Sequence, residues 1–166
     1  MANLIAFLSL LLAIILQMTV VTRVNMLHGA ADLVLLVLLA WVIHEQTDTH
    51  WRWGILAGIL VGVATALPFW IPLIEYIAIV GFVTIIQARV WQAPLLILFT
   101  AAFTGTFLIN GLDFLFLWIT GTPLVFEEVF NLVLLPSLIL NVLFALPVFG
   151  LMGEIAKQVF PAEVAA

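Results

Sequence analysis

Residues Leu4 to Val21 read LIAFLSLLLAIILQMTVV, a stretch without a single charged side chain. The hydrocarbon core of a bilayer is about 30 Å thick, so a helix needs about 20 mostly apolar residues to cross it. No basic residue precedes this stretch, and it lacks the small-residue cleavage site of a secretory signal. We therefore expect residues 4–21 to form a retained first transmembrane helix.

The composition of the whole chain agrees with this reading. Hydrophobic residues make up 66% of the 166 residues and charged residues only 8%, whereas an average soluble domain is about 25% charged. So few charges cannot cover a globule in water, but they suffice for the loops of a bundle in lipid. The absence of cysteine excludes disulfides, and the absence of a basic cluster argues against nucleic-acid binding.

Five further apolar segments follow the first, separated by prolines, glycines and most of the charged residues. The predicted fold is all-α, a bundle of six transmembrane helices in one integral membrane domain that covers residues 1–166. The spans are expected at about 4–21, 30–43, 54–67, 72–88, 94–119 and 131–152. The fifth span is longer than a bilayer requires, so it must tilt, bend near Gly105 or Gly111, or project beyond the headgroups.

The basic residues predict an orientation, because cytoplasmic loops are enriched in Lys and Arg. An even number of spans puts both termini on one side of the membrane. With the termini inside, Arg52, Arg89 and Lys157 are cytoplasmic and only Arg23 is outside. We therefore predict a multi-pass protein whose termini are both cytoplasmic.

Gly54, Gly58 and Gly62 recur every four residues and form one smooth stripe on a helix. Small residues let another helix approach closely in a membrane. The stripe is therefore a candidate for helix packing within the bundle or for docking of a partner helix or a lipid chain.

Polar side chains inside predicted spans are the candidates for a functional cavity, because a carboxylate in a membrane is costly and indicates function by default. The candidates are Asp32, Asn110, Asp113, Ser137 and Asn141. The alternatives are a helix cap for Asp32, solvent exposure for Asp113, and hydrogen bonds between helices for Ser137 and Asn141. Glu75 has the same ambiguity, with stabilisation by the helix dipole as the alternative.

The sequence carries no set of residues that indicates catalysis or a cofactor. It contains no Gly-x-Ser-x-Gly and no His-Glu-x-x-His motif, and its three histidines lack paired metal-ligand spacing. We therefore expect no enzymatic activity, no cofactor and no metal site.

Three stretches of the chain resemble the MreD family, small integral membrane proteins of the bacterial rod-shape system, or elongasome. Residues 29–36 (GAADLVLL) are similar to the Gly-x-x-Pro-Asp-Leu-x-Leu-Leu start of that family's second hydrophobic segment, with Ala31 at the usual Pro position. The glycine stripe is similar to its third segment, although Ala64, Thr65 and Ala66 stand where an acidic residue often follows. Residues 135–147 (LPSLILNVLFALP) are similar to its last span, with a central Asn and a following Pro.

The resemblance implies a non-enzymatic scaffold in the bacterial cytoplasmic (inner) membrane. Members of the family bind MreC, a bitopic membrane protein, and act with MreB, RodA and a class B penicillin-binding transpeptidase in lateral peptidoglycan synthesis. The family fold is similar to the substrate-binding subunits of energy-coupling-factor transporters. The alternative function is therefore that of a membrane subunit that binds a small solute, a vitamin or a metal, in a polar cavity.

Overall fold

The computed structural model describes residues 2–19, 28–44, 50–89 and 93–159, and within these ranges the chain is helical apart from short connections. This confirms the predicted all-α class. Arg23, which entered the predicted orientation, lies outside the described residues. The helices are α1 (Ala2–Thr19), α2 (Leu33–His44), α3 (His50–Ala64), α4 (Trp70–Arg89), α5 (Pro94–Ile119), α6 (Phe126–Val129), a π-helical turn η2 (Phe130–Leu134) and α7 (Leu135–Val159).

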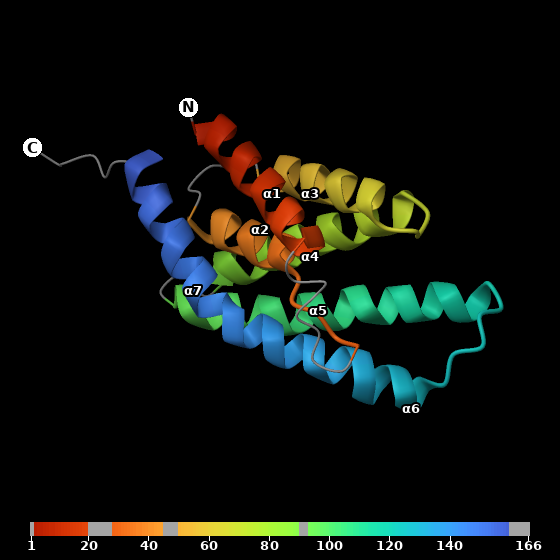
Figure 1. Cartoon of the computed structure of the whole chain (residues 1–166). Coiled ribbons are helices and arrows are strands. Elements are labelled where there is room, and N and C mark those ends of the chain that lie inside the picture. The colour runs from red at the N-terminus through yellow and green to blue at the C-terminus, as the bar shows by residue number, and fades with distance from the viewer. Residues whose placement is uncertain (1, 20–27, 45–49, 90–92, 160–166) are drawn as a thin grey trace, which may run out of the picture.

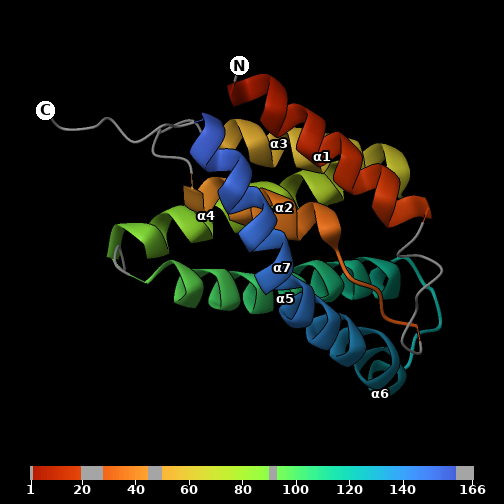
Figure 2. The ribbon, with the colours of Figure 1, turned by 60° about the vertical axis from the view of Figure 1, so that its left-hand side comes forward.

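Helix α2 is the centre of the bundle (Figures 1 and 2). It contacts α1, α3, α4, α5 and α7, and every residue from Val34 to Val42 is buried. A helix that is apolar all round must be covered on every side. The run of apolar residues in α2 therefore makes it the core around which the other helices assemble.

Three helical stretches of the described chain are long and apolar enough to cross a membrane, Trp70–Arg89, Pro94–Ile119 and Phe126–Gln158. Two shorter apolar helices cover Asn3–Thr19 and Leu33–His44. The architecture is thus that of a helical membrane bundle. The count of six crossings stays a prediction.

Helix α5 is continuous over its 26 residues, without a break at Gly105 or Gly111. Gly105 packs beside Leu35 and Ile79, and a side chain at Gly111 would meet nothing within 4 Å. At about 1.5 Å per residue the helix is about 39 Å long, so tilting or projection, rather than a bend, accommodates its length.

The glycine stripe of α3 faces α4 of the same chain. A Cβ atom at Gly54 would lie 2.9 Å from Val80 Cγ2, one at Gly58 2.7 Å from Leu73 Cα, and one at Gly62 2.9 Å from Phe69 Cδ2. Of the two roles expected for the stripe, the structure therefore shows packing within the bundle.

The helices run alternately in opposite directions, so their termini gather at two ends of the molecule (Figure 1). The starts of α1, α3 and α5 lie at one end with the last turns of α2, α4 and α7, on the left in Figure 1. Arg52 in the first turn of α3, Arg89 at the last residue of α4 and Lys157 in the last turn of α7 therefore share this end.

Candidate functional site

The polar interior begins with a short segment, residues 28–32, that lies along α7 before α2 starts. The N–H of His28 donates to the carbonyl of Leu132 (3.0 Å), that of Ala30 to Ser137 Oγ (3.2 Å), and that of Asp32 to Asn141 Oδ1 (2.6 Å). Alternate residues of an extended chain point their N–H groups to the same side, which explains why every second residue bonds to the helix. Because these residues are held by η2 and α7, α2 begins at Leu33, three residues after the predicted start of the span.

The π-helical turn and Pro136 make the α7 region able to receive this segment. In an α-helix the N–H of residue 136 would donate to the carbonyl of residue 132, but proline has no N–H. The Leu132 carbonyl instead accepts the hydrogen bond from His28. Contact is close, since a Cβ atom at Gly29 would lie 2.7 Å from both Ser137 N and Val133 O, so this position requires glycine.

Asp32 is both the cap of α2 and a member of the polar interior. Its Oδ1 accepts the N–H of Leu35 (2.9 Å), the bond an N-cap residue makes with the third residue of its helix. Its Oδ2 accepts the hydroxyl of Tyr76 on α4 (2.8 Å). Gln17 of α1 lies beside the Asp32 carboxylate, and its Oε1 accepts the N–H of Val34 (3.1 Å). The capping alternative is thus borne out, and the same carboxylate ties α4 to α2, while Gln17 ties α1 to α2.

Asn141 joins α7 to both α2 and α5. While its Oδ1 accepts the Asp32 N–H, its Nδ2 donates to Thr106 Oγ1 (2.7 Å). Thr106 in turn donates to the carbonyl of Ala102 (2.7 Å), and Asn110 Nδ2 donates to the carbonyl of Thr106 (2.9 Å). Asn141 and Thr106 are both fully buried, so these bonds replace the water that their polar atoms lose on folding.

A cavity of about 210 Å³ opens beside this network. It lies between the segment 28–32 and the helices α1, α5, η2 and α7. Its lining contains Gln17, His28, Ala30, Ala31, Asp32, Thr106, Ile109, Asn110, Val133, Ser137 and Asn141. Four of the five residues expected to line a polar cavity therefore surround one space.

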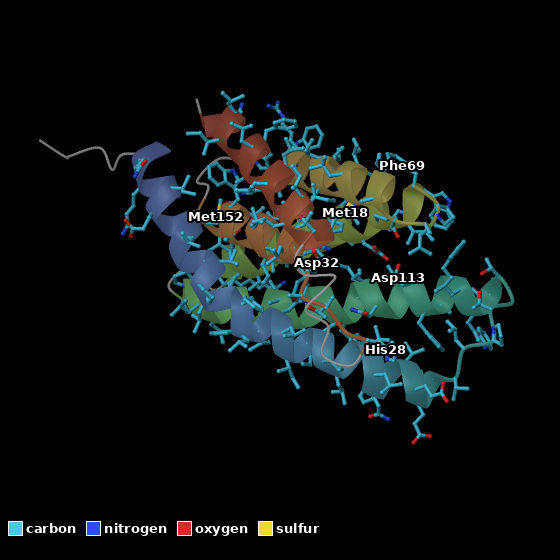
Figure 3. The ribbon with its side chains drawn as sticks, in the orientation of Figure 1. Met18, His28, Asp32, Phe69, Asp113 and Met152 are labelled. Atoms are coloured by element: carbon cyan, nitrogen blue, oxygen red, sulfur yellow. The ribbon has the colours of Figure 1, made fainter. Side chains whose placement is uncertain are left out.

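Asp113, the fifth, lies next to Glu75 instead. The two carboxyl groups lie close together, and Figure 3 shows Asp113 on the α4 side of α5. Glu75 is only 1% exposed, although it lies one turn inside α4, where the sequence suggested a role at the helix end.

Sequence reasoning missed Gln17, Tyr76 and Thr106, and it did not pair Glu75 with Asp113. Each of the three missed side chains is a polar residue within an apolar run, and this position was the one sign in the sequence that it belongs to the polar interior. The partners come from other helices, so only the fold shows which polar residues meet. Among the described residues, no group of three or more His, Asp or Glu side chains is arranged to hold a metal ion.

A comparison of this chain with protein-family models, with curated proteins and with solved structures finds no match.

Proposed function

We propose that this chain is a non-enzymatic scaffold of the MreD type in the bacterial cytoplasmic membrane. In this proposal it binds the single transmembrane helix of an MreC-like bitopic protein. Through that partner it helps to organise lateral peptidoglycan synthesis by RodA, a class B penicillin-binding transpeptidase and MreB.

One observation carries this proposal. The first and the last of the stretches that resemble the MreD family are more than 100 residues apart, and they hydrogen-bond to each other through Ala30 with Ser137 and Asp32 with Asn141. The resembling residues thus form one structural unit rather than isolated similarities. This supports a common architecture, because the Asp and the Asn of the two stretches are partners.

A groove on the surface of the bundle offers a place for the partner helix. It measures about 300 Å³ and lies between α1, α2 and α7. Its lining is almost wholly apolar and includes Ser9, Leu12, Ala13, Leu16, Leu33, Val37, Val148, Leu151, Met152 and Ile155. Helices associate in membranes by close packing of apolar and small side chains, and the glycine stripe is already used by α4.

Co-purification tests the scaffold. We expect an MreC-like protein, co-expressed with this chain, to be recovered with it from membranes in mild detergent. Leu12→Trp and Leu151→Trp fill the groove, so they should lower recovery of the partner at least about tenfold. Leu143→Trp is the control, because Leu143 is exposed on α7 and does not line the groove. Equal recovery of the partner with all three variants would show that the partner does not dock in this groove. No recovery of the partner with the unmodified chain would refute the proposal.

The polar cavity favours a second function, that of a membrane subunit that binds a vitamin or another small solute. Its volume is below the roughly 300–1,000 Å³ usual for ligand pockets, and Asp32 and Asn141 already bond to protein groups there. These two points place this function second. A ligand at 100 times its Kd would stabilise the protein by about 2.7 kcal/mol, so a thermal-shift screen with vitamins and metal ions that stays flat would dismiss it.

A further inference from the structure

Glu75 and Asp113 meet at the same depth in the bundle. Glu75 lies five residues after the start of α4, and Asp113 lies six residues before the end of α5. Because the two helices are antiparallel neighbours, about 8 Å and 9 Å of helix separate the two residues from the same end of the molecule. Two neighbouring carboxyl groups can hydrogen-bond to each other only when one of them carries a proton.

Each of these two side chains also has a buried oxygen atom without a partner. Glu75 Oε1 and Asp113 Oδ1 are out of reach of solvent and accept no hydrogen bond. Leaving a buried acceptor unsatisfied is costly, and more so for a charged one. Glu75 is 1% exposed, so its free oxygen points into the protein and not to a headgroup or to bulk water.

Among the residues that the structure describes, the charge nearest to the pair is also negative. Asp32, the residue before α2, is a further carboxylate close enough to repel a negative charge on Glu75. The hydroxyl of Tyr76, the residue after Glu75, already donates its hydrogen bond to Asp32. On α5 Asp113 is the one charged residue, and on α4 the nearest cation is Arg89, fourteen residues or about 21 Å along the helix from Glu75.

The other basic groups of the described chain lie elsewhere. His50 and Arg52 are in the first turn of α3, far from its Gly58–Leu73 contact with the start of α4. His44 packs on Phe149 at the end of α2, and Lys157 pairs with Glu154 at the end of α7. His28 lines the polar cavity, whose lining includes neither Glu75 nor Asp113. None of these side chains supplies a counter-charge to the Glu75–Asp113 pair.

We propose that Glu75 and Asp113 bind one small monovalent cation, a proton or a sodium ion, between α4 and α5. A proton satisfies the pair by forming a hydrogen bond between the two carboxyl groups, and a sodium ion does so by contact with the carboxylate oxygens. A divalent ion fits less well, since Ca²⁺ and Mg²⁺ take at least six oxygen ligands and no third acidic or His side chain of the described chain joins the pair as a ligand. This role does not depend on the scaffold function.

Thermal unfolding of the purified, full-length protein in detergent tests the site. Sodium chloride is exchanged for choline chloride at constant ionic strength, at about pH 8 and about pH 5. If sodium binds, Tm rises with sodium by at least about 2 °C at the higher pH, and less at the lower pH because protons compete. If the site holds only a proton, Tm responds to pH and not to sodium, and infrared spectra contain the carbonyl band of a buried, protonated carboxyl group.

Near-isosteric variants separate the site from general effects of salt and pH. Glu75→Gln and Asp113→Asn can still hydrogen-bond to the remaining carboxylate, so both should fold, and both should lose the sodium response or the protonated-carboxyl band. Glu128→Gln is the control, because Glu128 is exposed on α6, and it should behave like the unmodified protein. If the unmodified protein and both pair variants respond alike to sodium and to pH, the proposal is wrong.

Discussion

Asn141 makes the hydrogen bonds that connect three helices through one side chain. Its amide oxygen receives the N–H that precedes α2, and its amide nitrogen reaches Thr106 on α5. An amide offers both an acceptor and a donor, so an apolar residue or a residue with only one of these functions cannot replace it.

Asn141→Leu should therefore destabilise the bundle. Leucine has a similar size, but it removes the acceptor of the Asp32 N–H and the donor to the buried Thr106 hydroxyl, which costs about 1–3 kcal/mol. Circular dichroism during heating in detergent should show a Tm lower by several degrees. Asn131→Leu is the control, since Asn131 is exposed on η2, and a Tm equally lowered by both variants would contradict the role assigned to Asn141.

Gly29 leads to a second prediction at the scale of single residues. A Cβ atom there would come within 2.7 Å of backbone atoms of Val133 and Ser137. Backbone atoms cannot relieve the clash by a change of rotamer, as a flexible side chain can. Gly29→Ala should cost about 1–3 kcal/mol through overpacking. Gly150→Ala, on an open part of α7, should be neutral or stabilising by up to about 1 kcal/mol. Chemical denaturation of both variants compares the free energies of unfolding, and a stable Gly29→Ala would show that the segment 28–32 is not held against α7.

At the scale of elements, the seam between α3 and α4 shows what the glycine stripe does. Two helices that approach closely need positions without a side chain, and Gly58 is the tightest of the three, with Leu73 Cα at 2.7 Å and Pro72 O at 3.0 Å from its would-be Cβ. The stripe therefore contributes first to the folding of the bundle, and only a folded bundle can bind a partner.

Gly58→Ala should weaken this seam. We expect a loss of about 1–3 kcal/mol, visible as a smaller monodisperse fraction in size-exclusion chromatography after heating. Gly81→Ala on α4 is the matched control, because a Cβ there would meet nothing within 4 Å. A partner-binding defect in a Gly58→Ala protein of normal stability would instead favour the docking role.

Helix α5 could be predicted because local chemistry determines its ends, whereas α3 (His50–Ala64) begins four residues before the expected span 54–67 and α7 extends to Val159, beyond the expected end at 152. Helix α5 begins at Pro94 and ends at Ile119, as expected, with Gly121 in a left-handed conformation (φ 86°) just beyond it. The start of α2 could not be predicted, because the groups that hold residues 28–32 extended come from η2 and α7, 104 to 109 residues along the chain.

The same reason limits prediction of the interior site. A carboxylate in an apolar run is visible in the sequence, but its partner depends on which helices are neighbours. Glu75 and Asp113 could have been matched by their similar distances from the start of α4 and the end of α5, which lie side by side when the two helices are antiparallel. The hydrogen bond between Tyr76 and Asp32 leaves no comparable trace, since it joins helices that are not consecutive.

At the scale of the whole molecule, charge is distributed unequally along the bundle. Arg52, Arg89 and Lys157 lie at the end where α3 begins and α4 and α7 finish. Glu75 and Asp113 lie in the opposite half. The positive-inside rule assigns the basic end to the cytoplasm, so we expect the carboxyl pair to lie nearer the outer surface, together with the connection between α5 and α6.

The orientation can be measured cleanly because the chain contains no cysteine. Thr122→Cys places a thiol in the exposed α5–α6 connection, and Gln158→Cys places one at the exposed end of α7. A membrane-impermeant maleimide should label the first variant in intact cells and the second only after permeabilisation. The reverse pattern would invert the predicted topology. Labelling of both from the same side would contradict a crossing by residues 126–158, since the two thiols flank that stretch and a single crossing must separate them.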